Sequence, residues 1–252
     1  MTDIPSPIAM AVIGGSGLYA LAGLQDVQRR SVETPFGIPS GEVVIGTFAG
    51  KRMAFLARHG EDHHLAPHRV NYRANMWALH QLGARHIVGV NAVGGIRADL
   101  GPRTIVIPDQ LIDYTHGRMS SFHDVDGGKV EHVDFSAPYA EPLRRQLLAA
   151  AHAADVTVVD GGCHGVTQGP RLETRAEISR MRRDGCDVVG MTGMPEAVLA
   201  RELALDYACL ALVANHAAGC GDEAEISIAE IFAHLAAATA EVPRILAAMQ
   251  IV

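Results

Sequence analysis

Short apolar runs of strand length alternate along this chain with segments of helical period, and this alternation restricts the fold more than any other feature. The expected strands lie at 8–13, 42–48, 52–57, 86–90, 104–107, 156–159, 187–191 and 208–214. The expected helices lie at 70–83, 140–154, 174–184, 195–204 and from 227 onward, the last one bent at Pro243. Such alternation is typical of a central, mostly parallel or mixed sheet with helices on both faces. We therefore expect an α/β fold with a central mixed β-sheet flanked by helices.

The chain has 252 residues and shows no internal repeat, low-complexity tract or linker. This length fits a single domain, and we expect one domain over residues 1–252. One long irregular segment, from Thr115 to Pro138, is rich in His, Asp, Gly and Ser. Loops of this length within a compact domain are usually lids or binding loops, so we expect a functional loop here.

Charge and cysteine content exclude several classes of protein. The formal net charge is −7, only two of the 21 basic residues are lysines, and no basic run exceeds two residues. These features argue against nucleic acid and anionic membranes as partners. No apolar stretch is long enough for a membrane span or a signal peptide, and the four cysteines form no CxxC pair. We expect a cytoplasmic protein with free thiols.

A glycine-rich segment, Gly-Ser-Gly-Leu-Tyr-Ala at 15–20, follows the first expected strand. It fits the GxGxxA pattern of dinucleotide-binding proteins, but the following helix would be cut short at Gly23 and the second strand ending in an acidic residue is missing. A turn whose amides and Ser16 hydroxyl bind a single phosphate is favoured, because such a site needs only the local backbone. A plain tight turn remains the alternative.

Four histidines, at positions 59, 63, 64 and 68, lie within ten residues and raise the question of a metal site. The spacing is not HExxH, and Gly60 and Pro67 prevent one helix from presenting all four side chains, so we expect no bound metal. The Arg58-His59-Gly60 sequence ends a strand. It places a guanidinium and a backbone amide where α/β proteins bind ligands.

Three further motifs lie beside strand ends. Asn-Ala-Val-Gly-Gly at 91–95 is expected to form a strand-to-loop turn, Met-Thr-Gly-Met-Pro-Glu at 191–196 leads into a helix, and Gly-Pro-Arg-Leu-Glu-Thr-Arg-Ala-Glu occupies 169–177. The last predicts a capped helix with Thr174 as N-cap and Glu177 three residues later. A hydroxyl beside a helix N-terminus, such as that of Thr192, suits an anion. The arginines of the 169–177 segment are equally suited to structural ion pairs.

Taken together and in this order, these motifs resemble the trimeric purine nucleoside phosphorylases, and most closely their 5'-methylthioadenosine phosphorylase branch. The segments Thr-Pro-Phe-Gly-Ile-Pro-Ser at 34–40 and Val-Asn-Tyr-Arg-Ala-Asn at 70–75 also resemble that branch. The resemblance runs from about Ala11 to Ile231. It implies phosphorolysis, in which a nucleoside and phosphate give a free base and a ribose 1-phosphate, with no metal or organic cofactor and with a homotrimer as the assembly.

The resemblance also implies roles for individual residues. The phosphate-binding set is Ser16, Arg58, His59, Asn91, Ala92 and Thr192. The nucleoside-binding set is Leu172, Met191 beneath the ribose, Asn215 as the catalytic residue, His216 and Ala217. Substrate choice is assigned to Glu173, Ile228, Ile231 and His132. His132 would approach the 5' end of the ligand bound to a neighbouring subunit. Asn91 departs from the hydroxyl residue common at its position, although an amide still donates a hydrogen bond.

The base-binding segment departs from the family pattern. Members that act on 6-aminopurines carry Asp-x-Asp where this chain has Asn215-His216-Ala217. A carboxylate accepts from a 6-amino group and repels a 6-keto oxygen, whereas Asn215 can donate to O6 and accept from a protonated N7. This difference favours hypoxanthine or guanine as the base.

The sugar end points to the methylthio branch, since Ile228 and Ile231 fall where that branch lines the 5' pocket with aliphatic residues. Both residues also fit the apolar face of an amphipathic helix. A free 5'-hydroxyl buried there would lack a partner. We expect S-methyl-5'-thioinosine to be cleaved to hypoxanthine and 5-methylthioribose 1-phosphate. The alternatives are a methylthioadenosine phosphorylase, a general inosine/guanosine phosphorylase, and a non-catalytic nucleoside- or NAD-binding module.

Overall fold

The computed structural model describes residues 8–124, 129–221 and 228–251, which form one mixed sheet with helices on both faces. The strands are β1 Met10–Gly14, β2 Gln25–Arg30, β3 Val43–Phe48, β4 Lys51–Ala57, β5 His86–Gly95, β6 Ile105–Ile107, β7 Gln110–Asp113, β8 Val159–Asp160, β9 Cys163–Val166, β10 Val188–Gly190 and β11 Asp206–His216. The helices are α1 Tyr72–Gln81, α2 Glu141–Ala153, α3 Arg175–Arg183, α4 Gly193–Glu202 and α5 Ile228–Ala248, with a short 3-10 turn at Pro67–Arg69. The expected α/β fold with a central mixed sheet is confirmed.

The long strand β5 lies at the centre of the sheet. The strand order is β2-β3-β4-β1-β5-β10-β9-β7, and β11 pairs with both β5 and β6, which in turn pairs with β8. β5 runs parallel to β1 and β11 but antiparallel to β10. This single antiparallel neighbour of β5 determines where the functional cavity forms.

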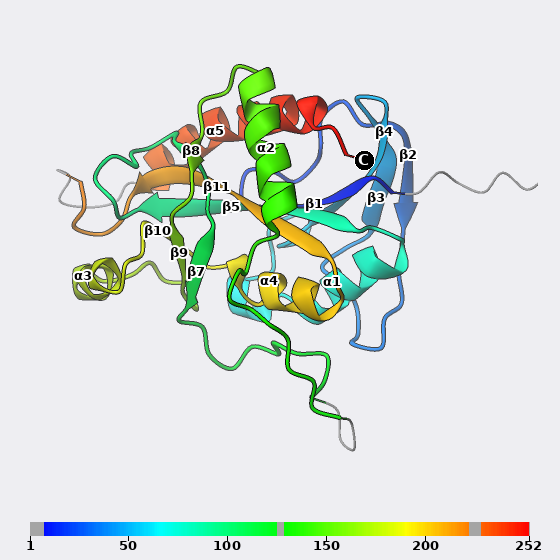
Figure 1. Cartoon of the computed structure of the whole chain (residues 1–252), viewed down its shortest axis with the longest axis horizontal. Coiled ribbons are helices and arrows are strands. Elements are labelled where there is room, and N and C mark those ends of the chain that lie inside the picture. The colour runs from blue at the N-terminus through cyan, green and yellow to red at the C-terminus, as the bar shows by residue number, and fades with distance from the viewer. Residues whose placement is uncertain (1–7, 125–128, 222–227, 252) are drawn as a thin grey trace, which may run out of the picture.

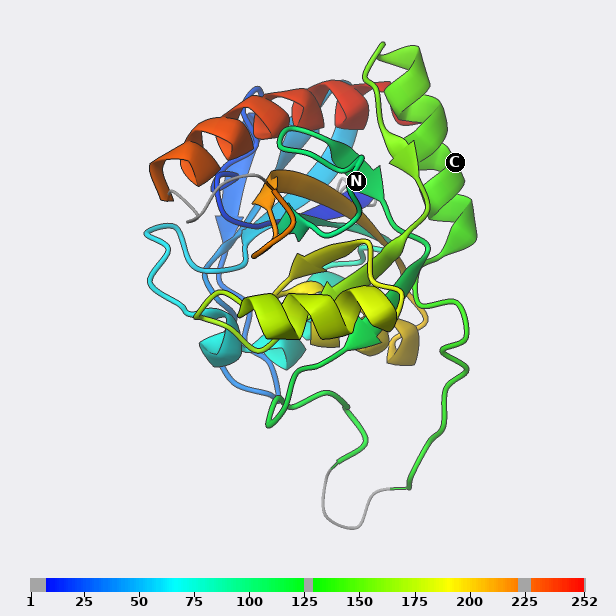
Figure 2. The same ribbon diagram turned by 90° about the vertical axis from the view of Figure 1, so that its left-hand side faces the viewer.

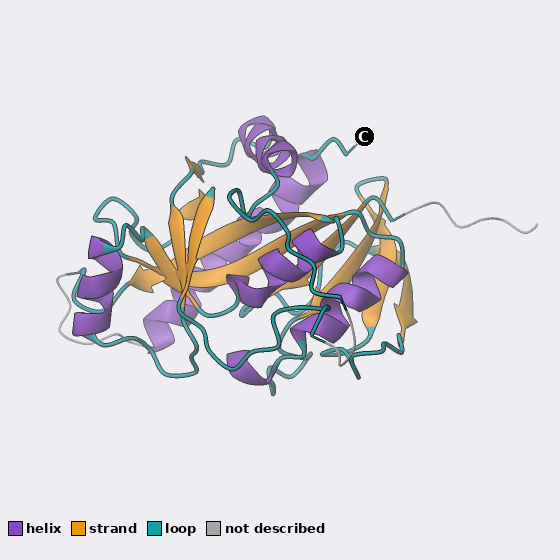
Figure 3. Ribbon diagram, turned by 60° about the horizontal axis from the view of Figure 1, so that its bottom comes forward, coloured by secondary structure: helices purple, strands orange, loops and turns teal. Residues whose placement is uncertain are grey.

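Two hydrophobic cores lie on opposite faces of the sheet. Along β1, Met10 and Val12 enter one core, whereas Ala11 and Ile13 enter the other, as the two-residue period of a strand requires. Helices α2 and α5 cover the first face, and α1 and α4 cover the second (Figures 1 and 3). The all-apolar strand β1 therefore suits a position that is buried on both sides.

Helix α3 lies apart from these layers, at the left of Figure 1, over a smaller cluster that includes Ile178 and Met181. Its N-terminus has the expected capping box, since the Thr174 hydroxyl accepts from the amide of Glu177 and the Glu177 carboxylate accepts from the amide of Thr174. The cap fixes the helix start immediately after Glu173, which faces the cavity described below.

The structure corrects the expected end of β5. The sequence predicted a strand ending at Val90 and a turn at 91–95, but β5 continues to Gly95. Gly94 and Gly95 pair with β10, and Asn91–Val93 pair with β11. The glycines, which look like a turn in the sequence, allow close approach of neighbouring chains: a Cβ on Gly95 would lie 1.9 Å from the carbonyl oxygen of Leu100.

Other elements differ in detail. Strands β2, β7 and β9 were not expected, because β2 is polar apart from Val27 and the other two are short. Residues 156–158 lie outside any strand. Helix α5 continues through Pro243. It is long and apolar enough to cross a membrane by length and composition alone, yet its Leu235, Val242 and Leu246 lie in the core over the sheet.

The connection from β7 to α2 is the long irregular segment expected from the sequence. Its described parts, 115–124 and 129–138, contain no helix or strand. Figure 2 shows the connection extending below the body of the molecule. Within it, His132 is exposed and Phe122 is buried beside Trp77 and Phe36.

Candidate active site

A cavity of about 450 Å3 opens where β1 and β10 separate along the same edge of β5. β1 pairs with Ile87–Gly89 and β10 pairs with Gly94 and Gly95. β1 runs parallel to β5 and β10 runs antiparallel to it. The carboxyl ends of β1 and β10 therefore face each other across the part of β5 between Gly89 and Gly94. The carboxyl ends of strands are where open α/β sheets bind ligands, and the cavity follows that rule.

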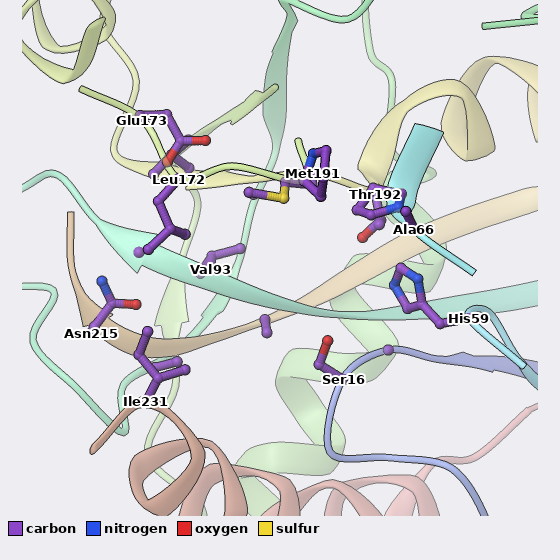
Figure 4. A pocket seen from close by; sticks show the side chains of 18 of the residues that line it. Ser16, His59, Ala66, Val93, Leu172, Glu173, Met191, Thr192, Asn215 and Ile231 are labelled. Atoms are coloured by element: carbon purple, nitrogen blue, oxygen red, sulfur yellow. The ribbon is translucent and has the colours of Figure 1, made fainter. Parts of the chain in front are cut away.

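Most of the predicted site residues line this cavity. They are Ser16, His59, Ala92, Leu172, Glu173, Met191, Thr192, Asn215, Ala217 and Ile231. They come from segments far apart in the chain: turns after β1, β4 and β10, the strand β5, the turn before α3, the end of β11 and the start of α5. Figure 4 shows most of their side chains around one space.

One end of the cavity is polar and suits an anion. Ser16, His59 and Thr192 lie close together there (Figure 4). Thr192 is the N-cap residue of α4, yet its side chain makes no capping hydrogen bond. An N-cap hydroxyl ordinarily accepts from the first turn of its helix, so the Thr192 hydroxyl is available to a ligand instead. The backbone of Met194 is not helical (φ −114°, ψ 139°), so the regular part of α4 begins after this residue and not at Thr192.

His59 is neutral at pH 7. Burial, and then the positive charge of Arg58, lower the pKa of His59 to about 4. Its Nδ1 lies 2.7 Å from the carbonyl oxygen of Leu65 and must donate to it. Nε2 of the neutral ring therefore carries the lone pair and can accept a hydrogen bond, which suits the protonated oxygen of hydrogenphosphate.

Arg58 does not line the cavity; it lies fully buried behind it. Nε and Nη2 donate to the two carboxylate oxygens of Glu196, at 2.5 and 2.9 Å. Nη1 donates to Val90 O at 2.9 Å, and Nη2 lies 3.4 Å from Ile13 O. Burial by itself lowers the pKa of Arg58, but the ion pair with Glu196 outweighs burial and raises it. Arg58 is therefore charged and bidentately paired.

Gly15 separates the Arg58 guanidinium from the cavity. A Cβ at this position would lie 2.8 Å from Nη1 of Arg58 and 2.5 Å from the carbonyl oxygen of Val90. Only glycine allows the turn after β1 to lie this close to the buried arginine. In this arrangement the Arg58–Glu196 pair lies directly beneath the Gly15-Ser16 turn.

Asn91 also lies outside the cavity. Its side chain is fully buried, Nδ2 lies 3.5 Å from the Cys209 thiol, and Oδ1 has no partner among the described residues. The neighbouring Ala92 lines the cavity in its place. The phosphate-binding role of Asn91 stays a prediction.

The opposite end of the cavity carries Asn215, Ala217, Leu172 and Glu173. A β-bulge at Ala214 shifts the pairing of β11, so that Val213 pairs with Val93 and Asn215 with Gly94. Bulges redirect side chains at the ends of strands, and this one turns Asn215 toward the cavity (Figure 4). Its Nδ2 donates to His216 O at 2.6 Å.

Glu173 provides a carboxylate at the same end. The Thr167 hydroxyl donates to its Oε1 at 2.6 Å, which fixes the side chain at the cavity wall. Burial raises the pKa of Glu173. The base end therefore combines a hydrogen-bond acceptor, an amide and the apolar side chains of Leu172 and Ala217.

The structure adds cavity residues that the sequence argument did not assign. His63, His64 and the 65–67 segment line the wall after His59. The His63 and His59 rings lie 4.6 Å apart between centroids, and the Tyr19 hydroxyl lies 3.2 Å from Nδ1 of His63. The sequence assigned His59 to phosphate but gave His63 and His64 no role in substrate binding. Within the described ranges no group of three His, Cys, Asp or Glu side chains is placed to hold a metal ion.

The remaining predicted residues lie elsewhere. His216 is half-buried outside the cavity, and His132 is exposed on the long connection. Ile228 begins α5, but its side chain lies outside the described part of the structure. No helix follows the Gly-Ser-Gly turn before β2, so the dinucleotide-binding alternative is wrong.

Comparison with known proteins agrees with this geometry. The sequence profile of the Phosphorylase superfamily matches residues 9–249. A protein of Xanthomonas campestris named probable S-methyl-5'-thioinosine phosphorylase is 59% identical over 239 residues, which is 95% of this chain and 96% of that protein. A purine nucleoside phosphorylase of Streptomyces coelicolor is 47% identical over 234 residues, covering 90% of this chain and 83% of that protein.

Among solved structures, methylthioadenosine phosphorylase from Schistosoma mansoni in complex with adenine superposes with a TM-score of 0.91 at 32% identity. The match covers 95% of this chain and 89% of that one. Sequence profile, identity and superposition agree over nearly the whole chain. This chain therefore belongs to the phosphorylase superfamily and is a pentosyl-transferring enzyme of the nucleoside phosphorylase kind.

Proposed function

We propose that the enzyme cleaves S-methyl-5'-thioinosine with inorganic phosphate to hypoxanthine and 5-methylthioribose 1-phosphate. The C1'–N9 bond breaks, and a phosphate oxygen forms the new bond to C1'. The proton of hydrogenphosphate ends on the released base. Phosphate is a co-substrate in this reaction, and no metal or organic cofactor takes part.

The observation that carries this proposal is that Glu173 and Asn215 lie at the same end of the cavity (Figure 4). A 6-oxopurine presents an N1–H donor and an O6 acceptor on neighbouring atoms. The Glu173 carboxylate suits the donor, and the Asn215 amide suits O6 or a protonated N7. Adenine presents the reverse pattern, with a lone pair at N1 and a donor at the 6-amino group.

Ala217 favours the same base. A carboxylate there would accept from a 6-amino group, but the alanine methyl offers adenine nothing. The methylthioadenosine alternative would leave the 6-amino group without its carboxylate partner and would place the lone pair of N1 against Glu173. Each buried mismatch costs about 1–3 kcal/mol.

The sugar end of the proposal depends on Ile231 and Met191. Both residues line the cavity, and Figure 4 shows Ile231 beside Asn215. An aliphatic wall suits a methylthio group and leaves a 5'-hydroxyl without a partner. This preference separates S-methyl-5'-thioinosine from inosine and guanosine.

The chemistry needs little from the protein beyond binding and charge. As the glycosidic bond breaks, the ribosyl group gains positive charge, and a phosphate held by Ser16, His59 and Thr192 stabilises that charge electrostatically. The leaving base gains negative charge, and Asn215 stabilises it by hydrogen bonding at N7 or O6. Arg58 makes no direct contact with the cavity, and Glu196 balances its charge.

The decisive test is kcat/KM for S-methyl-5'-thioinosine, S-methyl-5'-thioadenosine, inosine and guanosine, measured side by side with and without phosphate. We expect the first to exceed the second by about two to four orders of magnitude if two mismatches of about 1–3 kcal/mol add. The double substitution Asn215→Asp with Ala217→Asp should restore part of the adenine-nucleoside activity. Equal turnover of the two methylthio substrates would refute the 6-oxopurine assignment.

We also propose a homotrimer in the cytoplasm. The resemblance to trimeric phosphorylases supports the trimer, and so do the exposed apolar side chains of Val130 and Met119 on the same connection as His132. In a trimer this connection would place His132 near the 5' end of a neighbour's ligand. Light scattering after size exclusion tests the assembly, and a monomer with full activity would refute it.

A further inference from the structure

Arg118, on the long connection between β7 and α2, is held by an unusual set of partners. Its Nη1 donates to the carbonyl oxygens of Met191 and Met194, at 2.8 and 2.6 Å. Its Nη2 donates to the carbonyl oxygens of Thr167 and Gln168, at 3.2 and 2.8 Å, and Nε donates to the Gln168 side chain at 3.1 Å. The planar guanidinium thus joins two separate turns.

Each of these turns supplies residues to one end of the cavity. The carbonyl groups of Met191 and Met194 lie on either side of Thr192, at the anion-binding end. Thr167, whose hydroxyl holds Glu173, begins the turn that leads to the base end. Arg118 therefore connects the turn at the anion-binding end with the turn at the base end.

The two turns also touch each other directly at Gly169. Gly169 has φ +58°, and a Cβ there would lie 2.5 Å from the sulfur of Met191 and 3.4 Å from Pro67. Only glycine allows the two turns to approach this closely. Arg118 provides the polar part of that contact.

A third cavity segment is joined through Tyr72. The Tyr72 hydroxyl accepts from Nη1 of Arg118 at 3.2 Å and donates to the carbonyl oxygen of Pro67 at 2.8 Å. The guanidinium lies 5.3 Å from the centroid of the Tyr72 ring. Pro67 closes the segment that begins at His59 and lines the cavity.

Carbonyl dipoles, rather than a carboxylate, stabilise the positive charge of Arg118. In the described part of the chain no Asp or Glu lies within ion-pair distance of its guanidinium. Six acceptors surround its five N–H groups, in a fork that a lysine ammonium cannot reproduce.

We propose that Arg118 is a positioning residue, which fixes the phosphate-binding and base-binding turns relative to each other so that both substrates are held for attack at C1'. A displacement of about 1 Å at reacting atoms lowers rates about a hundredfold. The inference rests on the phosphorolysis common to the family and not on the identity of the base.

The test compares Arg118→Lys and Arg118→Ala with a matched control, Arg73→Ala. Arg73 holds the same connection nearby, through Ser121 O at 3.3 Å and Asp124 Oδ1 at 2.5 Å, without touching either turn. We expect the Arg118 variants to raise KM for both phosphate and nucleoside and to lower kcat/KM about a hundredfold, while Arg73→Ala stays within about threefold. Added guanidinium ion should recover part of the Arg118→Ala activity at concentrations that leave Tm unchanged.

Three results would overturn the inference. The first is an Arg118→Lys enzyme within threefold of the unmodified one. The second is a loss of activity that follows the unfolded fraction, with both KM values unchanged and no recovery by guanidinium. The third is an equal loss in Arg73→Ala. If Arg118→Ala does not fold, the two KM values of Arg118→Lys decide the question alone.

The same assays keep this inference separate from the proposed function. Each variant is measured on S-methyl-5'-thioinosine, S-methyl-5'-thioadenosine and inosine. The preferred nucleoside of the unmodified enzyme tests the proposed base, whereas the ratio of variant to unmodified enzyme on that nucleoside tests Arg118.

Discussion

Arg58 and Glu196 form a bidentate ion pair in which both side chains are completely buried, directly beneath the glycine turn that faces the cavity. Tyr207 donates a further hydrogen bond to Glu196 Oε2, at 2.8 Å. The pair joins the end of β4 to α4, so it links two of the segments that supply cavity residues. A buried pair of this kind is costly to break, because the remaining charge has no water to solvate it.

Glu196→Gln should therefore destabilise the protein by about 3–5 kcal/mol, since it leaves the Arg58 charge buried without a counter-charge. Urea unfolding monitored by circular dichroism measures the change. Glu241→Gln is the control, because Glu241 pairs with Arg244 on the surface and such pairs contribute about 0–1 kcal/mol. A loss below 1 kcal/mol in Glu196→Gln would show that the pair is not the stabilising element described here.

Thr192→Val should weaken phosphate binding selectively. Its hydroxyl makes no capping bond, so the substitution removes a ligand contact without removing a helix cap. A hydrogen bond to an anion contributes about 1.5–3 kcal/mol, which corresponds to a rise of about tenfold to a hundredfold in KM for phosphate. The nucleoside KM should stay within about threefold. Thr47→Val, on β3 away from the cavity, should change neither constant; an effect confined to the nucleoside would contradict the assignment.

The pH dependence of base choice should follow Glu173. Burial raises the pKa of this carboxyl, so it gains a proton at a higher pH than an exposed glutamate does. Once protonated, the carboxyl gains an O–H donor that suits N1 of adenine, and it becomes a weaker acceptor for N1–H of a 6-oxopurine. As the pH falls, kcat/KM for S-methyl-5'-thioinosine should decrease relative to that for S-methyl-5'-thioadenosine.

Glu173→Gln provides the control for this profile. Glutamine has the same length but does not titrate, so the ratio of the two kcat/KM values should become independent of pH. A ratio that still varies with pH in Glu173→Gln would assign the titration to another group.

Acid should destabilise the fold through two buried histidines. Burial, followed by the charge of Arg58, lowers the pKa of both His59 and His164 to about 4, while an unfolded chain protonates histidine near 6.5. Between these values the unfolded state binds more protons, so stability decreases as the pH falls from about 6.5 to about 4. Each histidine contributes up to about 3 kcal/mol to this decrease.

Urea unfolding at pH 7.5 and pH 5 measures that slope. His164→Leu should flatten it, because His164 is fully buried and its Nε2 has no partner among the described residues. His152, exposed on α2, provides the control substitution to leucine. An unchanged slope in His164→Leu would mean that other groups cause the acid sensitivity.

The sequence predicted the strand ends that build the site, because each one is an apolar run that stops at a glycine or polar motif. Gly15-Ser16, His59, Thr192 and Asn215 all follow such runs, and all line the cavity. Parallel order brings the carboxyl ends of β1, β4 and β11 to one edge, and the end of the antiparallel β10 meets them because β10 pairs with the last residues of the long strand β5. The capping box at Thr174 was equally visible, since it depends only on residues three apart.

Other features depend on packing between distant segments and leave no local pattern. Nothing near Arg58 in the sequence indicates Glu196, which lies 138 residues away. The continuation of β5 through Gly94 and Gly95 depends on β10, and the orientation of Asn215 depends on a bulge that only pairing with β5 reveals. Arg118 lay in a segment recognised only as a long loop.

The antiparallel placement of β10 has a consequence for assembly of the chain. The cavity exists only after Val188 and Val189 have docked beside Gly95 and Gly94, almost one hundred residues earlier in the sequence. Neither the first half of the chain nor the second contains a complete binding site. Phosphate and nucleoside therefore bind only the finished fold, and each occupied site shifts the folding equilibrium toward it, so that substrate in the cell acts as a stabiliser of the enzyme that consumes it.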